Sequence, residues 1–202
     1  MKKIFIDPAE LLQRSFELAI QIIESDFKPS YIIGVWRGGA PVGIAVQELF
    51  EYCAIPTDHI AIRTSSYEGI GQQSSTVRVF GLRHLAENIE AEQRLLIVDD
   101  VFDSGRSVDA IIAELRRVCR RNTPNDIRVA TPYYKPLRNK TERVPDFYVV
   151  ETDDWLVFPH ELQGLAFDEL IADKPPAVQA LFRQHEAILN PPLHGEPNAE
   201  QG

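Results

Sequence analysis

Residues 95–107, LLIVDDVFDSGRS, constrain the possible fold more than any other stretch of this sequence. Four apolar residues run directly into the adjacent carboxylates of Asp99 and Asp100, and a third aspartate follows three residues later. A short apolar run of this kind is typical of a strand that is buried on both faces, as in a parallel sheet. Apolar residues then recur at helical spacing over residues 108–119. The segment therefore predicts a strand, a polar turn and a helix, with carboxylates where the strand ends.

The rest of the chain repeats this alternation of strands and helices. Further strands are expected at residues 31–35, 59–66, 77–82, 127–134 and 146–150, and helices from Asp7, from Pro41 and over residues 172–189. The apolar residues expected to form the buried face of the first helix are Leu12, Phe16, Ala19, Ile20 and Ile23. The alternation predicts an α/β fold with a central, mainly parallel, twisted sheet flanked by helices. Ligands of such sheets bind beyond the carboxyl ends of the strands.

Length and charge limit the classes of function. A chain of 202 residues fits one domain, which we expect over residues 1–187, followed by a loose, proline-rich tail over residues 188–202. The net charge of −9 argues against nucleic acid or an anionic membrane as a partner. No apolar stretch approaches transmembrane length and no signal peptide is evident. Cys53 and Cys119 lie on apolar helix faces, where buried free thiols are expected, so a cytoplasmic location is predicted.

The acidic strand end and the turn behind it offer complementary chemistry. Adjacent carboxylates repel each other unless donors or a cation meet them, and both sugar hydroxyls and Mg²⁺ suit them. The following Ser-Gly-Arg-Ser turn leads into a helix N-terminus, whose free N–H groups favour a phosphate. Gly105 allows close backbone approach, and the serine hydroxyls add donors. One segment thus provides acceptors for a diol beside donors for a phosphate, which together fit a ribose 5-phosphate.

The segment LLIVDDVFDSGRSV resembles the signature of type I phosphoribosyltransferases. That signature is an apolar strand, two acidic residues, two apolar residues and then Asp-Thr/Ser-Gly-x-Thr/Ser; here serine stands at both hydroxyl positions. The resemblance implies that Asp99 and Asp100 bind the ribose hydroxyls of phosphoribosyl pyrophosphate (PRPP). It also implies that Asp103, near purine N7, is the catalytic base or hydrogen-bond acceptor. The residues implied to bind the 5-phosphate are Ser104, Gly105, Arg106 and Ser107.

Two further segments follow in the order of that family. GVWRGGAP, residues 34–41, resembles its pyrophosphate-binding loop, which implies this role for Arg37, Gly38 and Gly39. RTSSY, residues 63–67, resembles the base of its mobile lid, over residues 67–76 here. The residues assigned to the lid are Ser65, Ser66 and Tyr67. Standing alone, either segment would be read as an ordinary loop.

The segments YYKP and ETDDWLVFPHEL resemble the branch of the family that uses 6-oxopurines, namely hypoxanthine and xanthine–guanine phosphoribosyltransferases. There a lysine donates to the purine 6-oxygen, which implies this role for Lys135, and an aromatic ring stacks on the base, which implies Trp155. Backbone groups near Leu156 are expected to meet the purine. Glu161 and Asp100 are candidate ligands of a metal ion. Without the other motifs, Trp155 would be assigned to the core.

The resemblance covers about residues 30–162 and implies a Mg²⁺-dependent purine-salvage enzyme. It would transfer the 5-phosphoribosyl group of PRPP to hypoxanthine, guanine or xanthine and release pyrophosphate. A homodimer or homotetramer and a small hood formed by the terminal segments are also implied. Two alternatives stay open: a regulator of the same fold that senses PRPP or a nucleotide, and a phosphoribosyltransferase for another base.

Overall fold

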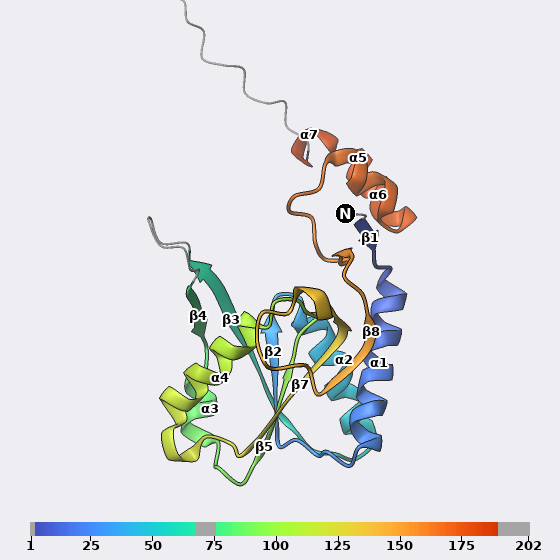
Figure 1. Ribbon diagram of the computed structural model, residues 1–202. Helices are drawn as coiled ribbons and strands as arrows, with labels where there is room; N and C mark the ends of the chain where they lie inside the picture. The colour runs from blue at the N-terminus through green and yellow to red at the C-terminus, as the bar shows by residue number, and fades with distance from the viewer. Residues whose placement is uncertain (1–2, 68–75, 190–202) are drawn as a thin grey trace, which may run out of the picture.

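The computed structural model describes residues 3–67 and 76–189, and a seven-stranded sheet forms its centre (Figure 1). Its strands are Tyr31–Trp36 (β2), Asp58–Tyr67 (β3), Thr76–Phe80 (β4), Arg94–Val98 (β5), Val101–Phe102 (β6), Asp126–Tyr134 (β7) and Phe147–Glu151 (β8). The strand order is β4-β3-β2-β5-β7-β6, and β8 also pairs with β7. Among the described strands of this sheet, β3 and β4 are antiparallel and the other pairs are parallel. The predicted α/β fold is confirmed.

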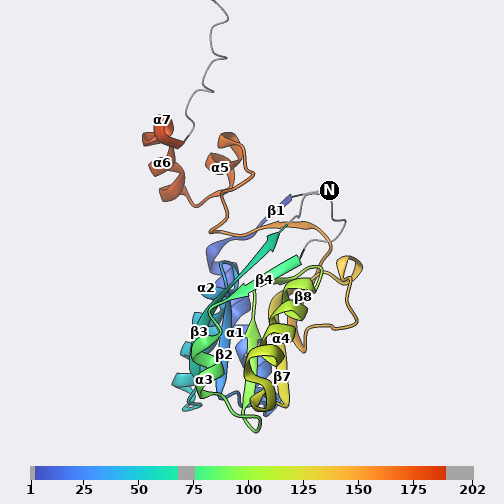
Figure 2. The ribbon, with the colours of Figure 1, turned by 90° about the vertical axis from the view of Figure 1, so that its left-hand side faces the viewer.

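Helices cover both faces of the sheet. Pro8–Glu24 (α1) and Gly39–Tyr52 (α2) pack on one face, and Arg83–Asn88 (α3) and Arg106–Cys119 (α4) pack on the other (Figures 1 and 2). Strand β5 explains the layering, because its successive side chains point to opposite faces. Leu95 and Ile97 join the core under α3 and α4, and Leu96 and Val98 join the core under α1 and α2. All four side chains are fully buried, as the apolar run predicted.

The parallel register brings three loops to one edge of the sheet. Gly34 of β2 and Ala130 of β7 both pair with Val98, the last residue of β5, and β2 and β7 continue beyond it to Trp36 and Tyr134. The residues that follow β2, β5 and β7 therefore meet at the carboxyl edge, where an α/β sheet binds its ligand.

A smaller unit above this edge is built from both ends of the chain. Lys3–Phe5 (β1) pairs in parallel with Trp155–Val157 (β9), with Lys3 opposite Trp155. Three short helices follow: Phe167–Asp173 (α5), Pro176–Gln184 (α6) and Glu186–Leu189 (α7). Figures 1 and 2 show these helices beyond the carboxyl edge, beside β1. This unit, which we call the hood, corresponds to the predicted hood. Among the described residues, no helix is both long and apolar enough to span a membrane.

Three expectations from the sequence were wrong in detail. Leu12, Phe16 and Ile20 face solvent on α1, whereas its buried face consists of Leu11, Ser15, Leu18, Ala19 and Ile22. The two apolar stripes are adjacent on the helix, and spacing alone did not tell which one packs on the sheet. Cys53 is exposed because α2 ends at Tyr52, although Cys119 is buried as expected.

The predicted helix over residues 172–189 is interrupted at Lys174 and Pro175. Proline lacks the N–H that a helix interior needs and disfavours helical geometry in the residue before it, so the chain breaks there and restarts at Pro176. Residues 188 and 189 of the predicted tail belong to α7, and residues 190–202 lie outside the described residues. Residues 68–75 of the predicted lid also lie outside them.

Candidate active site

Asp99 and Asp100 lie where β5 ends, and both carboxyl groups are largely withdrawn from solvent. The Asp100 N–H donates to Asp99 Oδ1 at 3.0 Å, which fixes the two residues relative to each other. Burial, and then the charge of Asp100, raise the pKa of Asp99 well above its ordinary value. Burial also raises the pKa of Asp100 to about 6, and the charge of Glu161 adds to this effect. The structure thus places two adjacent, buried carboxyl groups at the strand end, and their binding of ribose hydroxyls or a cation stays a prediction.

The loop after β2 packs directly against this carboxylate pair. A Cβ atom on Gly38 would overlap the Asp100 carboxylate, and one on Gly39 would overlap the carbonyl of Val98 and the backbone of Asp99. A Cβ at position 39 would therefore displace the backbone of the strand end, whereas one at position 38 would displace the Asp100 side chain. The structure brings the predicted pyrophosphate loop and the predicted ribose site into contact. The peptide bond between Trp36 and Arg37 is cis.

The turn that precedes α4 forms a cavity of about 220 Å³. Gly105 stands before the first turn of α4 with φ 75°, a left-handed conformation that favours glycine. A Cβ there would overlap the Thr141 hydroxyl and touch the Phe102 ring at 3.0 Å. The cavity is lined by Asp99, Asp100, Val101, Phe102, Asp103, Ser104, Gly105, Ser107 and Val108. Three of the four predicted phosphate-binding residues thus meet at the start of a helix, and the fourth, Arg106, is exposed.

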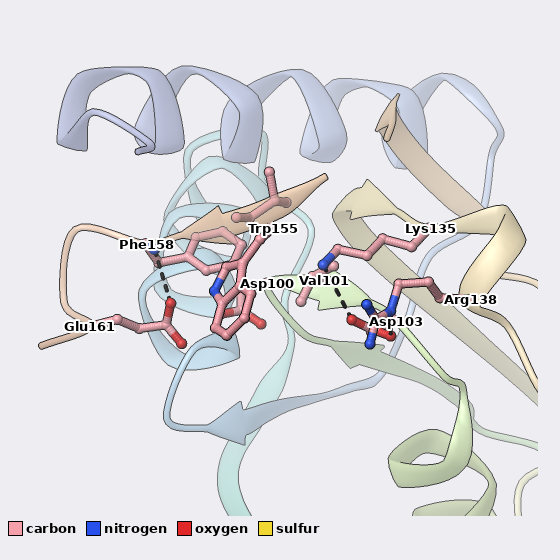
Figure 3. Close-up of a pocket in the computed structure, with 9 residues that line it drawn as sticks. Asp100, Val101, Asp103, Lys135, Arg138, Trp155, Phe158 and Glu161 are labelled. Atoms are coloured by element: carbon pink, nitrogen blue, oxygen red, sulfur yellow. Dashed lines mark hydrogen bonds and ion pairs between the residues drawn. The ribbon is translucent and has the colours of Figure 1, made fainter. Parts of the chain in front are cut away.

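A second cavity of about 320 Å³ adjoins the first and shares Asp103 with it. Lys135, which follows β7, is 6% exposed, and its ammonium lies 3.2 Å from Asp103 Oδ2. Arg138 Nε donates to Asp103 Oδ1 at 3.0 Å from the 3-10 turn Pro136–Arg138. Figure 3 shows both basic side chains converging on Asp103 at one side of the cavity. Lys135 is therefore not a surface lysine, and it lines this second cavity.

Trp155 forms the opposite part of this cavity. The indole is 52% exposed, whereas the next residue, Leu156, is 6% exposed and packs into the core. Figure 3 shows the ring beside Glu161, across the cavity from Lys135. This exposure shows that Trp155 is not a core residue. A large apolar ring on a cavity wall is available to stack on a planar ligand.

The turn Phe158–Glu161 closes the cavity behind Trp155. Glu161 Oε2 accepts a hydrogen bond from the Phe158 N–H at 3.0 Å. His160 Nε2 lies 3.8 Å from Asp100 Oδ2, and burial lowers the pKa of this imidazole. Among the described residues, no group of three His, Cys, Asp or Glu side chains is arranged to hold a metal ion by itself.

Sequence reasoning missed several residues that the structure brings to the site. Arg138 lies three residues after Lys135. The 3-10 turn between them places both side chains on the same side of the cavity. No sequence pattern predicted this 3-10 turn.

The predicted lid residues lie at the end of β3. Ser65 is opposite Arg78 of β4, and the neighbouring pairs are Ser66 with Val77 and Tyr67 with Thr76. The predicted lid residues thus end a strand at the edge of the described segment.

Together, the parallel sheet, the buried carboxylate pair and the glycine turn at a helix start define an α/β protein whose carboxyl edge suits a sugar phosphate. The family model of the phosphoribosyl transferase domain matches residues 7–164. The chain belongs to the phosphoribosyltransferase family, and this prediction from the sequence is confirmed.

Solved structures support the same assignment. A purine phosphoribosyltransferase from Pyrococcus horikoshii Ot3 is 26% identical, with a TM-score of 0.65 over 82% of this chain and 98% of that chain. A hypothetical protein from Neisseria gonorrhoeae with bound ppGpp is 20% identical, with a TM-score of 0.65 over 81% and 91%. The xanthine-guanine-hypoxanthine phosphoribosyltransferase of Helicobacter pylori is 18% identical, with a TM-score of 0.60 over 78% and 92%. The latter two share the fold. No curated protein sequence gave a match.

Proposed function

We propose that this protein transfers the 5-phosphoribosyl group of PRPP to a 6-oxopurine and releases pyrophosphate. The observation that carries the proposal is the junction of two cavities at Asp103, with a phosphate turn on one side and a lysine and an indole on the other. A phosphoribosyl donor and a planar base carrying a carbonyl would meet there. The similarity to the Pyrococcus horikoshii purine phosphoribosyltransferase supports a purine as acceptor.

In the proposed reaction, the bond between ribose C1 and pyrophosphate breaks and a bond to an imidazole-ring nitrogen of the purine forms. Asp99 and Asp100 accept from the ribose hydroxyls and hold the sugar in place, which lowers the entropic part of the barrier. Asp103 accepts the proton that the purine loses. Lys135 donates to the purine 6-oxygen, and Trp155 stacks on the ring.

The donor set fits a magnesium ion that arrives with PRPP. Mg²⁺ prefers oxygen ligands and binds proteins through one or two carboxylates together with substrate phosphates. Asp100, whose pKa is raised by burial and by the nearby charge of Glu161, supplies such a carboxylate. A cation there would relieve the repulsion between the Asp100 and Glu161 carboxylates. When bound, the ion would neutralise charge on the departing pyrophosphate.

A regulator that binds PRPP or a nucleotide without turnover is the second candidate. The carboxylate pair and the phosphate turn alone would serve that role, because neither needs the base cavity. The paired Asp103 and Lys135, at 3.2 Å, favour the enzyme, since a sensor of PRPP has no use for a proton acceptor and a donor in a separate base cavity. A phosphoribosyltransferase for another base is the third candidate.

One assay distinguishes these candidates. The purified protein is mixed with PRPP, Mg²⁺ and hypoxanthine, guanine, xanthine, adenine, uracil or orotate in turn, and the released pyrophosphate and nucleotide are measured. The double variant Asp99→Asn/Asp100→Asn serves as the inactive control. Turnover with an oxopurine is expected, whereas turnover with another base alone would reassign the acceptor. PRPP binding without turnover on any base would favour the regulator. The homodimer or homotetramer stays a prediction, which sedimentation equilibrium tests.

A further inference from the structure

The break between α5 and α6 buries a charged side chain that the proposed reaction does not use. Lys174 is only 6% exposed. Its ammonium donates to three backbone carbonyls, those of Phe158 at 3.2 Å, Pro159 at 3.0 Å and Glu161 at 3.0 Å. An ammonium has three N–H donors, so this arrangement uses all of them. Lys174 lies ten residues beyond the segment that the family model matches, which ends at residue 164.

The three carbonyls belong to the turn that walls the base cavity. Phe158 and Glu161 both line that cavity, and Figure 3 shows Glu161 at its side. Within the turn, the Glu161 N–H donates to the Phe158 carbonyl at 3.0 Å, and Glu161 Oε2 accepts from the Phe158 N–H at 3.0 Å. The three hydrogen bonds from Lys174 tie this turn to the helical part of the hood. The position of the Glu161 carboxylate therefore depends on a residue outside the cavity.

The backbone of Lys174 is itself held in place. Gln179, one turn into α6, donates through its Nε2 to the carbonyls of Lys174 at 2.7 Å and Ala172 at 3.3 Å. Burial lowers the pKa of Lys174, which reflects the unfavourable transfer of an ammonium out of water. A buried charge of this kind persists only where its donors are all used. An apolar side chain here would leave the carbonyls of the turn without their donor.

A second lysine fixes the other part of the same wall. Lys3 Nζ lies 2.6 Å from Glu169 Oε1 on α5 and 5.9 Å from the centre of the Trp155 ring. Lys3 also precedes the segment that the family model matches. The turn Phe158–Glu161 and Trp155, which form the hood side of the base cavity, are thus each in contact with a lysine of the hood.

We propose that Lys174 is a positioning residue for the purine, which acts by fixing the turn Phe158–Glu161 and with it the Glu161 side of the base cavity. The proposal rests on the proposed function, since it takes the occupant of this cavity to be the purine. Lys174 itself touches neither substrate. Most of the PRPP side is independent of Lys174, because Asp99 and the turn before α4 follow β5 and precede α4. The turn Phe158–Glu161 reaches that side through His160, whose Nε2 lies 3.8 Å from Asp100 Oδ2.

The kinetic test uses Lys174→Met, which keeps the chain length and apolar stem but removes the donors. The apparent KM for the purine is expected to rise about tenfold, the effect of losing a hydrogen bond from a charged group, with the KM for PRPP unchanged within about twofold. Lys28→Met, at an exposed position paired with Asp26 and far from the turn in sequence, is the matched control and should leave both constants unchanged. Equal changes in both KM values, or no change in either, would overturn the proposal.

The structural test does not need activity. Hydrogen exchange measured by mass spectrometry on peptides covering residues 155–165 should become faster in Lys174→Met, while peptides covering residues 94–108 stay as protected as in the unaltered protein. If Lys174→Met does not fold, Gln179→Ala, which loosens the same anchor, is expected to shift exchange in the same direction but less. Unchanged exchange would overturn the proposal. If the unaltered protein uses no purine, the proposed function fails, whereas this exchange result still decides whether Lys174 holds the turn.

Discussion

At the scale of the single residue, Asp103 occupies the most informative position in the site. Its carboxylate lines both cavities and pairs with Lys135 and Arg138 at 3.2 and 3.0 Å. The family resemblance predicted that Asp103 and Lys135 belong to the site. The sequence did not predict that their side chains form an ion pair. Contacts between loops after different strands depend on the register of the sheet, which spacing along the chain does not encode.

Replacing Asp103 by asparagine tests its role as proton acceptor. The amide keeps the shape but cannot take the proton, so kcat should fall by about 100-fold or more, while the KM for PRPP stays within about twofold. Steady-state kinetics with PRPP and the best purine measure both constants. Asp109→Asn, an exposed change on α4, is the control and should leave both unchanged. A parallel loss of kcat and PRPP affinity would mean that Asp103 binds the donor instead.

The indole of Trp155 allows a second test. Trp155→Ala removes the stacking surface and should raise the apparent KM for the purine by about 10- to 100-fold, within the range measured for base stacking on aromatic residues. Trp155→Phe, which keeps a ring, should lose much less. The KM for PRPP should not respond to either change. A purine KM that stays constant in Trp155→Ala would show that the base lies elsewhere.

At the scale of the element, the loops at the carboxyl edge are the parts most tightly constrained by their neighbours. The central strands were predictable because a strand buried on both faces must be apolar throughout, as β5 is. The three-residue strands β1 and β9 were not, because they are too short to display a period. The break in the last helix carried a signal, Pro175–Pro176, that outweighs the apolar spacing around it.

The contact between the loop after β2 and the strand end after β5 can be tested with one methyl group. A Cβ on Gly39 would overlap the Val98 carbonyl, so Gly39→Ala should displace the loop and raise the Kd for PRPP by at least about tenfold. Gly43→Ala is the matched control, because a Cβ there lies 3.5 Å from Gly34 Cα of β2, an ordinary van der Waals contact. Isothermal titration with PRPP and Mg²⁺ measures the affinity. Equal affinities in the two variants would contradict the packing described for this loop.

At the scale of the whole molecule, the carboxylate pair ties stability to pH. In the folded protein Asp100 keeps its proton up to a pH of about 6, whereas in the unfolded chain it loses it near its ordinary pKa of 3.8. Between these two values the folded state binds more protons than the unfolded state. The contribution of Asp100 to stability is therefore greatest below pH 4, decreases as the pH rises to about 6, and stays low above that.

Asp100→Asn removes this unfavourable charge. The variant should gain about 1–2 kcal/mol in free energy of unfolding at pH 8 and little at pH 4, since one unit of pKa difference corresponds to about 1.4 kcal/mol. Urea unfolding at both pH values, with a chelator and without PRPP, measures the difference. Glu92→Gln, an exposed change, should gain nothing at either pH. A gain of the same size at both pH values would mean that charge at Asp100 is not its source.

The hood has a consequence for how the molecule is made. Lys3–Phe5 leaves the ribosome long before its strand partner Trp155–Val157 and the anchor at Lys174. During translation the strands and turns that form the phosphate side are complete while the wall on the base side has no partner. The nascent chain thus passes through a stage in which half of the pocket exists, and Lys3–Phe5 finds its strand partner only after Trp155–Val157 has been made.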